Sequence, residues 1–180
     1  MPSLMKKLYQ EKAVPALQAK FKYSNPMEIP AIEKVVINVG AGIKHDYNLE
    51  MIAENLKKIT GQAPVTTQAK KSISNFKLRQ GQTIGLKVTL RGNRMYEFLD
   101  RLVHATLPRV HDFRGLSPKA FDKQGNYTIG MKDQLAFPEV KAESIEQLHG
   151  LEIVLVTSAK KEEEGLALLT ELGFPLKEKK

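Results

Sequence analysis

The sequence contains no cysteine among its 180 residues. This absence excludes disulfide bonds, zinc sites built on thiolates and cysteine nucleophiles. Long hydrophobic runs are missing as well, because apolar stretches such as IVLV (residues 153–156) are far too short to span a bilayer. The N-terminal segment MPSLMKKLYQEK lacks the apolar core of a signal peptide. We therefore expect a cytoplasmic protein that makes no contact with a membrane.

Acidic residues are absent from one long segment, Asn55 to Tyr96, which carries nine lysines and arginines over 42 residues. The rest of the chain has 19 basic and 20 acidic residues, so this segment holds the whole excess of a net charge of +8. A concentrated basic stripe is typical of a surface that binds a polyanion. The alternative is a plain solvated face, although such faces usually intersperse acids among the bases. The pattern therefore favours nucleic acid as the partner.

Motifs for catalysis are also missing. The sequence has no His-x-x-x-His pair, no Gly-x-Ser-x-Gly elbow and no phosphate-binding loop ending in Gly-Lys-Ser or Gly-Lys-Thr. His-Asp dipeptides stand at residues 45–46 and 111–112, but adjacent side chains diverge in regular structure. Residues 40–42 (GAG) lack the third glycine of a dinucleotide fingerprint, which favours a turn over a cofactor site. We expect no enzyme, no metal site and no cofactor.

Strand and helix patterns divide the chain into about nine elements. Strand patterns occupy residues 33–40, 65–69, 83–92, 126–131 and 151–157. Helices are expected to begin at Ser3, at Asp46 or Asn48, at Asn93 and at Ser158. The leucines expected to face inward from the first and last helices are Leu4, Leu8, Leu17, Leu166, Leu169 and Leu172.

Residues 83–92 (TIGLKVTLRG) show the clearest alternation of the chain. The side chains expected to face the core are Ile84, Leu86, Val88 and Leu90. The opposite, polar and basic face carries Thr83, Gly85, Lys87, Thr89 and Arg91. Because amphipathic helices need one face of the sheet, the other face stays available for a ligand. The predicted fold class is α+β: one two-layer domain over residues 1–180, with about five mostly antiparallel strands, helices on one face and a long basic loop.

That loop is the stretch AKKSISNFKLRQGQ, residues 69–82. Its four cations, which suit contacts with phosphates, are Lys70, Lys71, Lys77 and Arg79. Phe76 lies among them, and an exposed ring would stack on an unpaired base, whereas a ring folded inward would only plug the core. Side chains suited to ribose hydroxyls and base edges are Gln62, Thr66, Gln68, Ser72, Asn75 and Gln80. This mixture favours RNA over duplex DNA.

Several blocks of the sequence resemble the L-five family of bacterial large-subunit ribosomal proteins, which bind 5S rRNA. The blocks are EKVVINVG, LKKITGQAPVTTQAKKSISNFKLRQG, RGNRMYEFLDRL, PRVHDFRGL and FDKQGNYTIGMKDQLAFPE. They occur in the family's order and run nearly from end to end of the chain. The resemblance therefore implies a structural, ribosome-bound protein of the central protuberance that anchors 5S rRNA to the large rRNA.

The resemblance also implies three contact surfaces. The residues expected to bind rRNA, on or near the sheet face, are Lys34, Asn38, Gln62, Thr66, Thr67, Lys87 and Arg91. The basic loop, residues 70–83, is expected to reach P-site tRNA and large-subunit rRNA through Lys70, Lys71, Ser72, Asn75, Phe76, Lys77, Arg79 and Gln80. The tract 109–140 is expected to bridge to a small-subunit head protein through Arg109, His111, Asp112, Arg114, Lys132 and Asp133. Neighbouring 5S rRNA-binding ribosomal proteins are further expected partners.

Two other functions remain open on the sequence. One is a free-standing RNA-binding regulator or chaperone that uses the same basic loop. The other is an enzyme that acts on a phosphorylated or nucleotide substrate through an unrecognised site. The enzyme would need a deep pocket with perturbed ionisable groups, so the shape of the molecule separates it from an RNA-binding protein.

Overall fold

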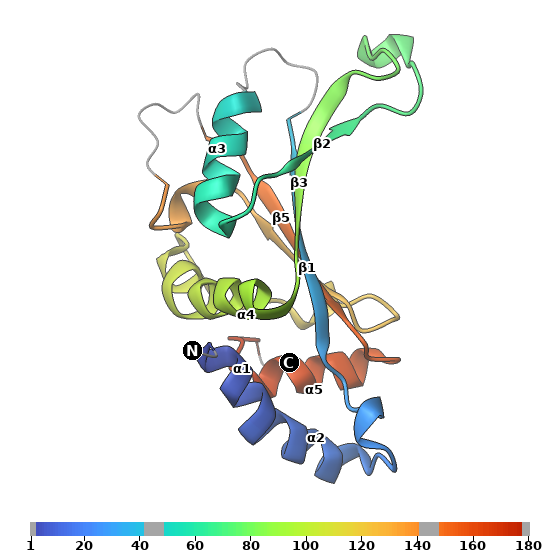
Figure 1. The fold of residues 1–180 in the computed structure, drawn as a ribbon, viewed down its shortest axis with the longest axis vertical. Coiled ribbons are helices and arrows are strands. Elements are labelled where there is room, and N and C mark those ends of the chain that lie inside the picture. The colour runs from blue at the N-terminus through green and yellow to red at the C-terminus, as the bar shows by residue number, and fades with distance from the viewer. Residues whose placement is uncertain (1–2, 42–48, 141–147, 178–180) are drawn as a thin grey trace.

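A computed structural model describes residues 3–41, 49–140 and 148–177 of the chain. The strands form one sheet in the order β2-β3-β1-β5-β4, and every neighbouring pair is antiparallel (Figure 1). Their bounds are β1 (Ile32–Gly40), β2 (Val65–Gln68), β3 (Thr83–Leu90), β4 (Tyr127–Met131) and β5 (Leu151–Thr157). The predicted α+β fold with a five-stranded antiparallel sheet is confirmed.

The helices gather on one side and at one end of the sheet. In Figure 1, α3 and α4 lie on one side of the sheet, and α1, α2 and α5 lie below it. Their bounds are α1 (Leu4–Leu8), α2 (Val14–Phe21), α3 (Leu49–Thr60), α4 (Gly92–Arg101) and α5 (Glu162–Glu171). A five-residue π-helix (Tyr9–Ala13) joins α1 to α2, and another (Leu102–Thr106) extends α4. None of the helices in the described part of the chain is long and apolar enough to cross a membrane.

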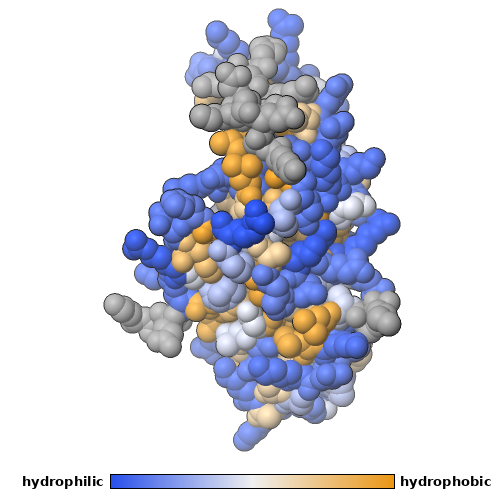
Figure 2. All heavy atoms as spheres, turned by 90° about the vertical axis from the view of Figure 1, so that its left-hand side faces the viewer, coloured by the Kyte–Doolittle hydropathy of each residue, from blue (hydrophilic) through white to orange (hydrophobic). Residues whose placement is uncertain are grey.

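The core lies between the sheet and these helices. The helix-facing side chains of β1 and β3 that are at most 2% exposed are Val35, Ile37, Val39, Leu86, Val88 and Leu90. Ile84, expected in the core with them, is only half-buried near the start of β3. The apolar stripes that cover them come from α3 (Ile52, Leu56, Ile59) and α4 (Met95, Phe98, Leu99). Each fully buried side chain of this size contributes about 1.5–3 kcal/mol to folding. Seen from the helix-covered side, hydrophilic residues dominate the surface, and apolar atoms show only in separate areas (Figure 2).

The expected start of the last helix is wrong. Helix α5 begins at Glu162, and Ser158 instead accepts a hydrogen bond on its Oγ from the backbone N–H of Ala31 at 2.9 Å. Ser158 therefore ties the end of β5 to the entry of β1, a long-range contact that overrides its tendency to cap a helix. Leu168 is fully buried in α5, while Leu166 is only half-buried.

Two details near the N-terminus also differ from expectation. Leu4 is 59% exposed, and Met5 takes the buried position in α1. Asn93 does not cap α4, which has Arg91 as its N-cap residue; the Asn93 side chain instead accepts a hydrogen bond from Lys6 Nζ at 3.1 Å. The helix cap expected at position 46 or 48 lies outside the described residues.

Candidate RNA-binding interface

The side of the sheet that faces away from α3 and α4 carries charged and polar side chains together with several valines, and no described helix covers it. We call it the open face. Strand pairing places Asn38 of β1 beside Lys87 of β3 on one side and beside Glu152 of β5 on the other. Gly130 of β4 continues the same row beyond Glu152. Paired residues in antiparallel strands lie about 4.5–5.5 Å apart between Cα atoms, so these side chains form one continuous row. We call Lys87, Asn38 and Glu152 the polar row.

Val65 of β2, which is 60% exposed, pairs with Lys87 at one end of the polar row, and glycines lie beside the row on the same face. Gly85 of β3 pairs with Gly40 of β1 and Thr67 of β2 on the same face. A Cβ atom on Gly85 would lie 2.5 Å from the Val39 carbonyl oxygen, so a side chain there would push β1 and β3 apart. At Gly40 and Gly130 a Cβ would meet nothing within 4 Å. Gly40 and Gly130 are exposed while Gly85 is buried, so the face is low and accessible at the first two positions, which suits the close approach of an RNA backbone or base.

The structure brings most of the expected rRNA-binding residues to this face. The residues of the open face are Lys34, Asn38, Thr67 and Lys87. Gln62 lies at the edge of β3, because its Nε2 donates to the Thr89 carbonyl at 3.3 Å. Arg91 is exposed and lies between the end of β3 and the start of α4.

Thr66 departs from this group. It pairs with Leu86, a core-facing residue of β3, so its side chain points to the helix side of the sheet. Thr66 stays exposed because β2 is the edge strand and no described helix covers it there. Thr66 and Thr67 are therefore on opposite faces, as neighbours in a strand must be.

The basic loop is a closed hairpin that stands away from the body of the molecule (Figure 1). Its base is held by two backbone hydrogen bonds, from the Ala69 N–H to the Gln82 carbonyl (2.9 Å) and from the Gly81 N–H to the Ala69 carbonyl (3.0 Å). Further out, Ile73 and Leu78 form an antiparallel bridge. The Ser72 hydroxyl accepts a hydrogen bond from the Gln80 N–H at 2.9 Å. These contacts within the loop give it a defined shape.

The loop presents both charge and an aromatic ring to solvent. Phe76 is 65% exposed, which excludes the core-plug alternative and leaves the ring free to stack. Ile73, at the start of the tip, is 43% exposed. The loop's cations are all exposed and form no ion pair with any described residue: Lys70, Lys71, Lys77 and Arg79.

A groove of about 820 Å³ runs beside β4, the edge strand at the other end of the sheet. Its lining includes all the residues expected at the subunit bridge: Arg109, His111, Asp112, Arg114, Lys132 and Asp133. Tyr127 anchors the wall of the groove, since its hydroxyl donates to the Ser117 carbonyl at 2.8 Å. Burial raises the pKa of Tyr127 to about 12, so this hydroxyl stays protonated. Residues 109–117 and residues 127–133, which are apart in sequence, thus line the same groove.

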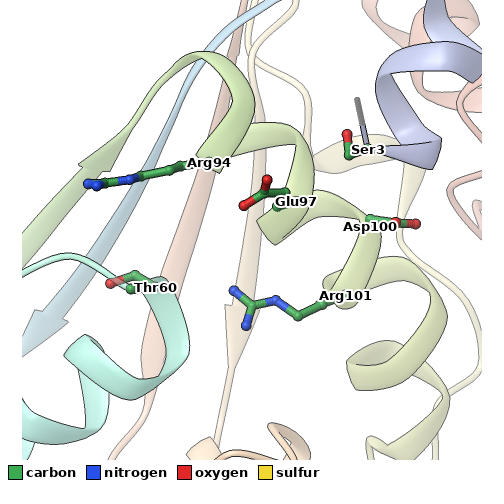
Figure 3. Close-up of a pocket in the computed structure, with 7 residues that line it drawn as sticks. Ser3, Thr60, Arg94, Glu97, Asp100 and Arg101 are labelled. Atoms are coloured by element: carbon green, nitrogen blue, oxygen red, sulfur yellow. The ribbon is translucent and has the colours of Figure 1, made fainter. Parts of the chain in front are cut away.

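A second cleft, of about 530 Å³, lies among the start of α1, the end of α3 and α4 (Figure 3). The charged side chains on its wall do not converge: Arg94 extends away from Glu97 and Asp100. Arg101 is used in packing, because it donates to the Ile59 carbonyl (2.9 Å) and to Glu139 Oε1 (3.1 Å). Among the residues that the structure describes, no three His, Asp or Glu side chains cluster to hold a metal ion. The cleft therefore has no arrangement suited to acid–base catalysis.

Sequence reasoning missed two polar features of the molecule. Asp100 and His104, one helical turn apart, lie in contact, with 2.9 Å between Asp100 Oδ1 and His104 Nδ1. Their i,i+4 spacing was the available signal. Glu152 was overlooked because the segment LEIVLVT reads as an apolar central strand. Glu152 is the one charged residue in this apolar segment, and that exception could have marked it as a residue of the open face.

An uncovered sheet face with a polar row, next to a shaped basic hairpin, defines the class of α+β proteins that bind nucleic acid over a broad surface. Comparisons with known proteins identify the family. The model described as ribosomal protein L5 matches residues 25–79, and the model for the C-terminus of the same ribosomal family matches residues 83–176. The chain belongs to the ribosomal protein L5 family.

Individual relatives agree with the family models over nearly the whole chain. The large ribosomal subunit protein uL5 of Trichlorobacter lovleyi is 55% identical over 175 residues, which are 96% of this chain and 98% of the relative. The protein of the same name from Acaryochloris marina is 54% identical and covers 97% of both chains. The one from Brevibacillus brevis is 51% identical over 98% of this chain and 99% of the relative.

Proposed function

We propose that the open face of the sheet binds 5S rRNA and helps to attach it to the large rRNA in the central protuberance. Membership in the family makes the chain a structural constituent of the large ribosomal subunit and not an enzyme, bound to ribosomes in the cytoplasm. The observation that carries the 5S rRNA proposal is the polar row. Asn38 and Lys87 lie side by side on a sheet face that no described helix covers.

The basic loop would serve a different RNA. Its cations suit phosphates and its exposed Phe76 suits a base or ribose, and the hairpin projects from the body of the molecule. P-site tRNA and the large rRNA are the partners that we assign to it. Because the hairpin is already closed by its own hydrogen bonds, binding requires little ordering of the backbone.

The groove beside β4 is the surface that we assign to the bridge with a small-subunit head protein. Its lining combines charged side chains, such as Arg109, Asp112 and Lys132, with apolar ones, such as Ile129 and the 42% exposed Leu135. Charged and apolar groups together are usual at a protein–protein interface. Neighbouring 5S rRNA-binding ribosomal proteins complete the proposed partners, and we treat residues 1–180 as one domain.

A gel-shift titration with transcribed 5S rRNA tests the open face. Lys87→Ala and Lys57→Ala remove the same charge from opposite sides of the molecule, since Lys57 is exposed on α3. We expect Lys87→Ala to weaken binding and to make the salt dependence shallower by about one ion, and Lys57→Ala to change neither. Asn38→Ala should weaken binding at every salt concentration. Equal effects of the two lysine substitutions would contradict binding on the open face.

A further inference from the structure

Glu152 is an acidic residue in the middle of the proposed RNA-binding face. It is exposed on β5, pairs with Asn38 of β1 and lies two strands away from Lys87 of β3. That separation is on the order of 10 Å between Cα atoms. On the same face Gly130 of β4 pairs with Glu152, and the half-buried Val154 is the next residue of β5.

The carboxylate of Glu152 has no partner among the described residues. It forms neither a hydrogen bond nor an ion pair with them, and Lys87 is two strands away rather than adjacent. It is therefore not part of a structural salt bridge within the described part of the chain. Gly130, its partner on β4, has open space where a Cβ would stand, so the carboxylate is accessible from that side.

A free carboxylate on an RNA-binding face needs an explanation, because it repels the phosphates that Lys87 attracts. Ionised carboxylates only accept hydrogen bonds, and the donors that unpaired RNA offers at its base edges are mainly amines. Glutamate is a known type of acceptor for an exocyclic base amine. The polar row thus offers a cation for phosphate, an amide and an acceptor in order.

We propose that Glu152 is a specificity-determining residue, whose carboxylate accepts a hydrogen bond from the exocyclic amine of a nucleobase in the bound RNA. The inference rests on the proposed function, since it requires RNA on the open face. Lys87 then supplies affinity that is independent of sequence, while Glu152 selects for a base that carries an amine.

The test is the substitution Glu152→Gln, which keeps the shape and removes the charge. Electrostatics alone predicts tighter RNA binding. Exchange of an ionised acceptor that faces an amine for the weaker, neutral carbonyl of glutamine instead predicts about tenfold weaker binding to 5S rRNA. Glu54→Gln is the matched control, because Glu54 is exposed on α3 and the change in net charge is the same. Poly(U) is the second probe, since uracil has no exocyclic amine. Glu152→Gln should leave poly(U) binding unchanged or slightly tighter, and Glu152→Asp should retain part of the 5S rRNA affinity.

Each other outcome has a definite meaning. If Glu152→Gln tightens 5S rRNA binding as Glu54→Gln does, Glu152 is not a contact and the inference is wrong. If it weakens 5S rRNA and poly(U) alike, the carboxylate accepts from a ribose hydroxyl or a ring N–H, and selection for a base with an exocyclic amine is wrong. If Lys87→Ala and Asn38→Ala have no effect either, the open face does not bind 5S rRNA and the proposed function itself fails. A thermal melt of Glu152→Gln close to that of the parent chain verifies that folding is intact.

Discussion

Ile37 and Asn38 are adjacent on β1, yet they face different surroundings. Ile37 points to the helices and is 1% exposed, while Asn38 points to the open face between Lys87 and Glu152. The same contrast holds on β3, where Leu86 and Val88 are buried on either side of the exposed Lys87. Packing dictates the residues of the helix-covered face. The polar groups of the open face, Lys87, Asn38 and Glu152, form no side-chain hydrogen bond or ion pair with a described residue, so packing within the chain does not account for them.

The largest expected effect is the difference in stability between alanine substitutions at Ile37 and at Asn38. Ile37→Ala leaves a cavity in the core and should lower the free energy of unfolding by about 2–5 kcal/mol. Asn38→Ala should change it by no more than about 1 kcal/mol, because the half-buried Asn38 side chain forms no hydrogen bond with a described residue. Urea denaturation measures both values. The comparison fails if Asn38→Ala destabilises the protein as much as Ile37→Ala does.

Phe76→Ala tests the same contrast between binding and stability at the basic loop. Removing an exposed ring should cost about 1–3 kcal/mol of RNA-binding free energy if it stacks on a base, with the thermal midpoint nearly unchanged. Filter binding to tRNA and a thermal melt give the two numbers. Phe137→Ala is the control, because Phe137 is 2% exposed and packs on Phe98, so it should lower the midpoint strongly.

The loop cations should have a smaller effect that depends on salt. Lys70→Ala and Lys71→Ala should each weaken RNA binding and reduce the slope of log affinity against log salt by about one. Lys20→Ala serves as the control, since Lys20 is exposed on α2, remote in sequence from the basic segment. An unchanged slope in the loop variants would remove these lysines from the phosphate contacts.

The smallest effect concerns two histidines in opposite surroundings. His149 is 5% exposed, and burial lowers its pKa from 6.5, although contact with the Gly150 carbonyl opposes this shift. As pH falls below about 6.5 the unfolded chain takes up a proton that folded His149 resists, so stability should decrease slightly. His149→Gln should flatten this decrease between about pH 7 and 5.5, while substitution of the exposed His111 should leave it intact. If thermal melts across this pH range show both variants behaving like the parent chain, His149 is not the group responsible.

The sequence carried enough information to predict the sheet and its polar face. Alternation in residues 83–92 predicted which side chains of β3 face the core, because a strand's side chains must alternate. Ser158 misled the prediction, since its capping tendency is local while its actual partner, Ala31, is 127 residues away. Thr66 and Thr67 were assigned to one surface, but neighbouring positions of a strand cannot share a face.

The parts that sequence could not supply depend on long-range pairing. Alternation alone does not reveal that β5 lies beside β1, and without that pairing Glu152 cannot be placed next to Asn38. The groove depends in the same way on the meeting of residues 109–117 with β4. The exposure of Phe76 follows from the Ile73–Leu78 bridge, which fixes the direction of the loop tip.

Crosslinking of this chain within intact large ribosomal subunits, mapped residue by residue, tests the division between the two RNA-binding surfaces most directly. We predict crosslinks to 5S rRNA at Asn38 and Lys87 on the open face, and crosslinks to other RNA at Lys70 and Phe76 in the loop. Crosslinks to 5S rRNA that fall on exposed residues of α3, such as Lys57, and spare the open face would contradict it.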